Sequence, residues 1–281
     1  MQGLPVVVVP VGADDVALDA CLAALDAATP AGTPVWLADD ARSGPRGQAV
    51  IAHWLARTRL DASHSRRPRV LGDVAHLDDV LKACGDLDVA VLASDARPAP
   101  GWLERLAACL AHDGAIASAT PWCNSGETAS WPRVGELNAA PADPGRLARA
   151  CARMPATYPE LPAAVSHAVL LRGAARVRAG GLDAATFAGV GAALVDLSLR
   201  LSGLGWRNAL CDTAFVARDA ETPAGEGDEA RLAVRWPGWH ARLAPMLMHD
   251  PLHALRERLG VLLDACGSVP PQGDLFDAGA P

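Results

Sequence analysis

Short apolar segments of strand length alternate with amphipathic segments of helical spacing in the first 120 residues. Residues 6–9 are an unbroken valine run between two prolines, and similar apolar runs occupy residues 35–38 and 89–93. Such strands are buried on both faces of a sheet. Strands joined by helices predict right-handed crossovers and an α/β fold, with a mostly parallel sheet flanked by helices.

The segments between these strands have apolar residues at helical spacing. Helices are predicted at residues 14–28, at 50–55 and at 102–110, with Asp14 and Asp15 as caps of the first. A weak strand is predicted at residues 70–71, followed by a helix around Val80.

After Pro121 the alternation is less regular. Strands are expected at residues 165–171, 209–210 and 215–216, and a helical tail at 239–265. We therefore predict one α/β domain over residues 1–235 and a C-terminal helical extension over 236–266. Residues 267–281, rich in Gly, Pro and Asp, are predicted to be a disordered tail.

Composition excludes several classes of protein. A net charge of -7 argues against a nucleic-acid binder, which needs a basic face. The seven cysteines include no C-x-x-C pair, so we expect buried, reduced thiols and no zinc site. With no secretory signal and no apolar run of membrane-spanning length, the expected location is the cytoplasm, either free or peripheral at the inner membrane.

Aspartates follow two of the predicted strands. Asp39 and Asp40 come after the second apolar run, and Asp95 comes after the run at residues 89–93. The carboxyl ends of parallel strands meet at one edge of a sheet, where open α/β sheets bind their ligands. These aspartates are therefore predicted to lie in a binding site.

Several segments match the motifs of one enzyme family in order and spacing. They are residues 7–11, 37–43, 92–96, 100–103, 120–124, 180–183, 195–200 and 205–207. In them the chain resembles the family 2 glycosyltransferases of bacterial surface-glycan synthesis, which have the GT-A fold. The resemblance implies transfer of a sugar from a nucleotide-sugar donor to a glycan or glycoprotein acceptor, with inversion if the protein is active.

The resemblance also implies a donor site made of Pro10, Asp39, Asp40, Ser94 and Asp95. Asp95 matches the D-x-D region and would bind a divalent cation, Mn²⁺ or Mg²⁺, that neutralises the leaving diphosphate. The two aspartates of the second strand would hold the base and ribose. The alternative is that these acids only form turns and helix caps.

On the acceptor side, the resemblance assigns Trp122 and Asn124. An inverting transferase needs a general base, which relatives supply from a Glu-Asp pair. Ala193 and Leu194 stand at those positions, so the catalytic-base motif is degenerate. Asp196 is the nearest remaining carboxylate and the candidate catalytic residue. A helix acid is an equally good interpretation, because residues two apart on a helix point in different directions.

Other positions also depart from the family pattern. Gly12 and Ala13 replace an aromatic residue and Asn after the first strand, and Arg218 follows a strand where relatives often have a metal-binding His. Arg218 could pair with a phosphate, but the expected interpretation is an exposed loop charge. His76 is expected at the surface or rim.

Three functions are therefore compared. An active transferase is favoured by Asp95 and the aspartate pair, whereas a non-catalytic binding or scaffold protein is favoured by the missing Glu-Asp pair. A nucleotidyltransferase is weaker, because residues 12–15 are acidic where a basic phosphate loop would be needed. Assembly as a homo-oligomer or with a partner transferase stays open.

Overall fold

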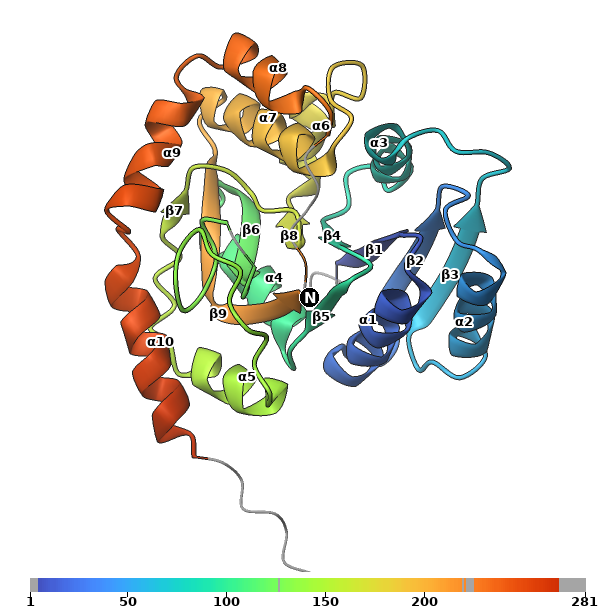
Figure 1. The fold of residues 1–281 in the computed structure, drawn as a ribbon, viewed down its shortest axis with the longest axis horizontal. Coiled ribbons are helices and arrows are strands. Elements are labelled where there is room, and N and C mark those ends of the chain that lie inside the picture. Colours follow the sequence, from blue (N-terminus) through green and yellow to red (C-terminus); the bar gives the residue numbers. More distant parts are fainter. Residues whose placement is uncertain (1–4, 126, 219, 221–224, 268–281) are drawn as a thin grey trace, which may run out of the picture.

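The computed structural model describes residues 5–125, 127–218, 220 and 225–267. The chain folds around a central sheet flanked by helices, which confirms the predicted α/β class (Figure 1). The predicted tail lies outside the described residues, apart from Gly267. None of the described helices is long and apolar enough to cross a membrane.

The sheet combines parallel and antiparallel pairs. Its strands are β1 (Val6–Val11), β2 (Pro34–Asp39), β3 (Asp61–Arg66), β4 (Val89–Leu92), β5 (Ala96–Pro98), β6 (Ile116–Trp122), β7 (Glu160–Leu161), β8 (Ala168–Leu171) and β9 (Arg207–Arg218). They are ordered β3-β2-β1-β4-β8-β6-β9-β5, and β7 pairs with β9. The half from β3 to β4 is parallel, as predicted, whereas β8 is antiparallel to both of its neighbours.

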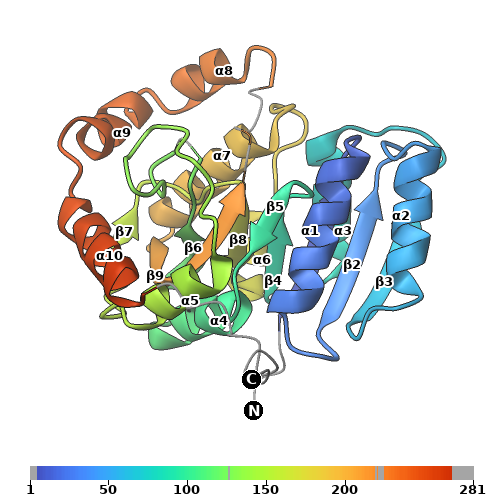
Figure 2. The same cartoon turned by 60° about the horizontal axis from the view of Figure 1, so that its bottom comes forward.

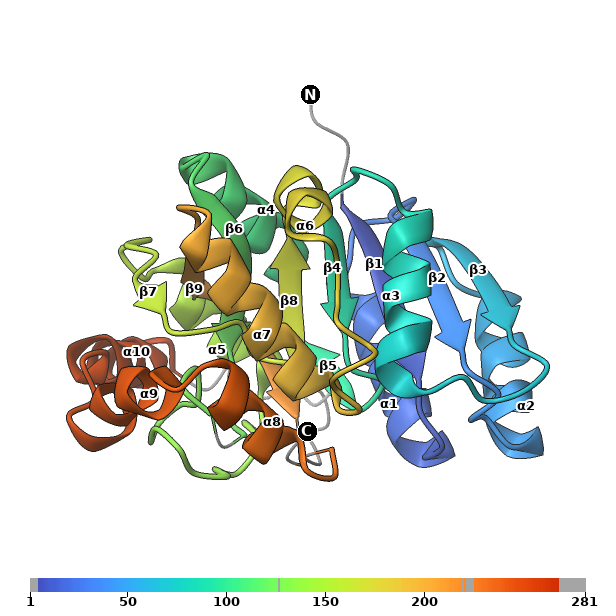
Figure 3. The ribbon, with the colours of Figure 1, turned by 90° about the horizontal axis from the view of Figure 1, so that it is seen from above.

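Helices cover both faces of this sheet. They are α1 (Asp15–Ala28), α2 (Pro45–Leu55), α3 (Asp73–Ala83), α4 (Trp102–His112), α5 (Pro144–Ala152), α6 (Gly173–Ala179), α7 (Val190–Gly203), α8 (Asp228–Arg235), α9 (Trp239–Met248) and α10 (His253–Ala265). Val7 and Val9 of β1 pack in a core with α1 and α4, and Val8 packs in a second core with α3 and α7. Alternate residues of one strand thus serve opposite faces, and Figure 3 shows α3, α6 and α7 together on one face.

Two predicted strands differ in the structure. Residues 70–71 lie in a loop, and the third strand is β3, whose sequence Asp-Ala-Ser-His-Ser-Arg has no apolar run because it lies at the sheet edge. The strands expected at residues 209–210 and 215–216 are parts of one long strand, β9. Polar Asp212 and Thr213 interrupt the apolar pattern, although both are buried inside the strand.

The C-terminal helices run along the outside of the second half of the sheet. In Figure 2, α9 and α10 border the region of α5 and β7. Met246, Leu252 and Leu259 are buried in a cluster that includes Trp122 and Leu147. The C-terminal helices thus share a core with β6, α5 and β9.

Candidate functional site

A cavity of about 340 Å³ lies where β1, β2, β4 and β9 end. This volume is within the range of ligand-binding clefts. Helix α3 and the first residues of α7 complete its wall. Of the predicted donor-binding residues, Pro10, Asp40, Ser94 and Asp95 line the cavity, which places them together at the expected edge of the sheet.

Gly12 lets two loops of the cavity wall approach each other. Its N–H donates to Ser94 Oγ at 3.0 Å. A Cβ on this glycine would lie 2.8 Å from the same oxygen, closer than carbon and oxygen can pack. The glycine that departs from the family pattern therefore joins the end of β1 to the end of β4.

Asp95 forms an ion pair with Arg218 across the cavity. Arg218 Nε lies 2.9 Å from the Asp95 carboxylate. Arg218 is the last residue of β9 and is only 7% exposed, so the expectation of an exposed loop charge is wrong. The sequence predicted a short strand at residues 215–216 followed by a loop. Strand β9 instead continues to Arg218 and places this arginine in the cavity wall.

Asn124 fixes the position of Arg218. The main-chain N–H of Arg218 donates to Asn124 Oδ1 at 2.8 Å, and Asn124 Nδ2 donates to the main-chain carbonyl of Arg218 at 2.7 Å. Asn124 is buried and does not line the cavity. Asn124, predicted for the acceptor side, thus positions the main chain of the cavity residue Arg218 without lining the cavity itself.

The aspartate pair after β2 has two separate structural tasks. Asp40 accepts main-chain N–H groups of Leu71 and Gly72 and fixes the turn before α3. Asp39 is fully buried outside the cavity wall and pairs with Arg66 at 2.9 Å. Burial alone would raise the pKa of Asp39, but hydrogen bonds from Ser43 and Arg42, together with the Arg66 charge, hold it below its ordinary value.

Two buried histidines lie in this region. His76 lines the cavity and is 6% exposed, and neither ring nitrogen has a hydrogen-bond partner among the described residues. His76 is therefore a wall residue and not a surface residue. His167 Nε2 donates to the Pro121 carbonyl at 3.2 Å, and its Nδ1 has no hydrogen-bond partner among the described residues. Burial, aided by the charge of Arg218, lowers the pKa of His167 to about 3, so it is neutral at pH 7.

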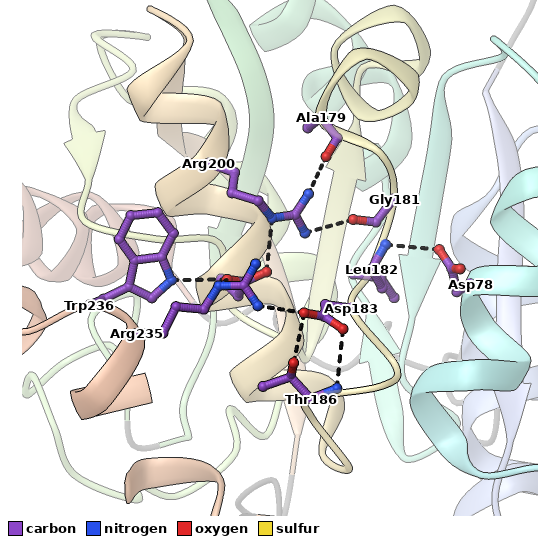
Figure 4. A network of polar contacts seen from close by, with 10 residues as sticks. Asp78, Ala179, Gly181, Leu182, Asp183, Thr186, Arg200, Arg235 and Trp236 are labelled. Carbon is purple, nitrogen blue, oxygen red and sulfur yellow. Dashed lines mark hydrogen bonds and ion pairs between the residues drawn. The ribbon is translucent and has the colours of Figure 1, made fainter. Parts of the chain in front are cut away.

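Asp196 is not among the residues that line the cavity. It belongs to a polar network that includes Arg200, Arg235 and Trp236, whose side chains are labelled in Figure 4. Its carboxylate is fully buried and accepts from Arg200 Nε at 2.9 Å and from Trp236 Nε1 at 2.9 Å. Arg235 Nε lies 3.1 Å from the same carboxylate. A group held by two arginines and an indole is suited to joining α7 to α8, and this geometry favours the helix-acid interpretation.

The positions expected to hold the base pair are also buried. Ala193 is 0% exposed and Leu194 is 1% exposed, and both pack between α7 and the sheet. The residues of this region that reach the cavity are Gly189 and Val190, at the start of α7. Trp122 is likewise buried, with Nε1 donating to the Asp212 carbonyl at 3.1 Å.

The side chains around Asp95 do not fit a divalent cation well. Within the described residues, no group of three or more His, Cys, Asp or Glu side chains is placed to hold a metal ion. Asp95 itself is already paired with a guanidinium at 2.9 Å. A hard cation prefers several oxygen ligands, and this donor set supplies one engaged carboxylate. The predicted role of Asp95 as a metal ligand therefore lacks support from its surroundings.

Sequence reasoning located the cavity edge but missed that His76 and Arg218 are buried in the cavity wall. His76 stands alone on a helix, and Arg218 is 123 residues from its partner Asp95. The signal for Arg218 was its place after a strand, at the position where relatives often have His.

No protein-family model matches the sequence, and no curated protein matches it. Among solved structures, the mannosyltransferase PcManGT from Pyrobaculum calidifontis, in complex with GDP-Man and Mn²⁺, is 15% identical with a TM-score of 0.59, over 96% of this chain and 78% of that one. GalNAc-T7 with UDP, GalNAc and Mn²⁺ is 13% identical with a TM-score of 0.61, over 92% and 55%. S. aureus TarS 1-349 with UDP-GlcNAc is 14% identical with a TM-score of 0.53, over 92% and 83%. The chain thus has the GT-A fold of glycosyltransferases.

Proposed function

We propose that the protein is a glycosyltransferase that binds a nucleotide-sugar donor in this cavity. The observation that carries the proposal is the Asp95–Arg218 pair in a cavity at the carboxyl edge of a GT-A sheet. This is the edge where open α/β folds bind nucleotides. The similar structures of PcManGT and TarS are complexes with GDP-Man and UDP-GlcNAc, which supports a donor of this class.

The acceptor in this proposal is a glycan or glycoprotein, and transfer inverts the configuration of the sugar. These parts rest on the order of motifs in the sequence. We also propose a cytoplasmic location. The free cysteines support it, because cysteines tend to form disulfides in oxidising extracytoplasmic compartments. The residues proposed to contact the donor are Pro10, Asp40, Ser94 and Asp95, which line the cavity.

A second candidate is a donor-binding protein without turnover. Carboxylates of the cavity wall are already engaged: Asp73 pairs with Arg42 at 2.8 Å, and Asp14 accepts main-chain N–H groups of α1. Asp40 and Asp95 are bound as described above. This engagement, together with the buried Ala193 and Leu194, favours the non-catalytic alternative.

Thermal unfolding with a panel of nucleotide sugars tests donor binding. Each donor is added with EDTA and, separately, with Mn²⁺. At a donor concentration near 100 times Kd, the gain in unfolding free energy is about 2.7 kcal/mol, or roughly 5 to 10 °C in Tm. The free sugars serve as controls and should produce no shift.

Donor hydrolysis, measured as release of the nucleoside diphosphate, separates the two candidates. Release of the nucleotide with a stabilising donor supports the transferase. Stabilisation without any release supports the non-catalytic protein. If no nucleotide sugar shifts Tm in either buffer, the donor site itself is refuted.

A further inference from the structure

Arg218 lies beside Asp95 in the wall of the cavity. Its guanidinium lines the cavity and is ion-paired with the Asp95 carboxylate at 2.9 Å. The side chain is 9% exposed, whereas that of Asp95 is 29% exposed. The positive charge is therefore built into the wall of the site at the end of β9.

The main chain keeps this guanidinium in place. Arg218 is paired with Ala96 across β5 and β9, and Asn124 binds both its N–H and its carbonyl. Asn124 is itself held, since its Nδ2 also donates to the Asn138 carbonyl at 3.0 Å. These contacts fix the main chain of Arg218 at the cavity wall, so only the side-chain rotamer is free to change.

A divalent cation on Asp95 would have to share the carboxylate with this charge. Like charges a few ångström apart in a partly buried site repel strongly. The neighbouring cavity acids offer no replacement ligand set, because Asp40 is bound by main-chain N–H groups and Asp73 by Arg42. The surroundings of Asp95 thus suit a guanidinium better than a metal ion.

We propose that Arg218, and not a divalent cation, is the charge partner of the donor diphosphate, with Asp95 as the residue that positions it. This inference rests on the proposed donor-binding function. A guanidinium presents five N–H donors in a planar fork that matches two phosphate oxygens at once. With this charge supplied by the protein, nucleotide binding needs no added metal.

Isothermal titration with UDP and with GDP tests this inference on the full-length protein. In EDTA and in Mn²⁺, Kd of the preferred nucleotide should agree within about threefold. Arg218→Gln should weaken binding by about 30-fold or more in both buffers, because a charged fork to the phosphates is lost. Arg218→Lys, which keeps the charge but not the fork, should lie between the two.

Arg207→Gln is the matched control. Arg207 lies at the other end of the same strand and is ion-paired with Asp113 at 2.7 Å, away from the cavity. Its Kd should equal that of the wild type. If Arg218→Gln does not fold, Asp95→Asn replaces it. Without the positioning carboxylate, Kd should rise by less than about tenfold and stay independent of Mn²⁺, whereas loss of a metal ligand would abolish binding.

The outcomes separate this inference from the proposed function. Binding that requires Mn²⁺, or a Kd for Arg218→Gln equal to that of the wild type, overturns the role of Arg218 and leaves the donor site standing. Absence of binding with every nucleotide in both buffers overturns the donor site and this inference together.

Discussion

At the scale of single residues, two buried histidines have ring nitrogens without a partner among the described residues, and one of them, His76, lines the cavity. His76 has no hydrogen-bond partner for either ring nitrogen among the described residues, and His167 lacks one for Nδ1. An unsatisfied buried polar group costs free energy, of the order of 1–3 kcal/mol. A ligand that bonds to His76 would recover part of this cost, which makes its position in the wall informative.

Replacing His76 by Phe should therefore have opposite effects on stability and on binding. The apo protein should gain about 1 kcal/mol in unfolding free energy, measured with urea, because a buried unsatisfied group is removed. Affinity for the preferred nucleotide should fall by about tenfold, measured by titration, because the ligand loses a partner. His240→Phe, at an exposed position on α9, is the control. An unchanged Kd in the His76 variant would show that the ring does not contact the nucleotide.

At the scale of elements, α8 holds α7 against the cavity. Asp228 of α8 accepts the N–H of Gly189 at 2.7 Å, and a Cβ on Gly189 would lie 3.0 Å from that carboxylate. Further along, Asp196 of α7 binds Arg235 and Trp236, at the end of α8. The cavity wall made by Gly189 and Val190 thus depends on contacts between these two helices.

Asp196→Ala should destabilise the protein by about 3 kcal/mol in urea unfolding, because two arginines and an indole lose a buried acceptor. Nucleotide affinity of the folded variant should change little, since Asp196 lies outside the cavity. Asp79→Ala is the control. Asp79 pairs with Arg67 at 3.2 Å on the surface, and its loss should cost less than about 1 kcal/mol. If the wild type releases nucleotide and a stable Asp196 variant binds the donor without releasing it, Asp196 is instead a catalytic residue.

At the scale of the whole molecule, the C-terminal helices complete the second half of the fold. Arg256 of α10 donates to the carbonyls of Ser130 and Thr128, at 2.7 Å each, and lies over the Trp122 ring at 5.1 Å from its centroid. It also pairs with Asp250. Burial lowers the pKa of Arg256, although the charge of Asp250 opposes this. One side chain thus connects α10, the loop after β6 and the core around Trp122.

Arg256→Ala should lower the unfolding free energy by about 3 kcal/mol, because buried carbonyls and Asp250 lose their partner. The loop that contains Thr128 and Ser130 should also become sensitive to limited proteolysis. Arg258→Ala, on an exposed position of the same helix, should leave both properties unchanged. If the two variants behave alike, α10 is not an integral part of the fold.

Much of the fold could be predicted from local patterns. The valine run of β1 and the apolar run of β4 show their burial in sequence, because a strand covered on both faces has no polar positions. The same patterns placed Asp40 and Asp95 at strand ends, and both line the cavity. By contrast, β3 has no apolar run because it is an edge strand, so the strand predicted at residues 70–71 was misplaced by several residues.

The sequence by itself determined the α/β class, the edge of the sheet that forms the site, and Asp95 as part of it. These follow from burial periodicity and from where strands end. Tertiary structure alone decided that Arg218 pairs with Asp95, that Asn124 holds Arg218, and that Asp196 is buried between helices. The physical reason is that a side chain's ion-pair partner depends on which strands become neighbours, and β9 returns to the site 123 residues after Asp95.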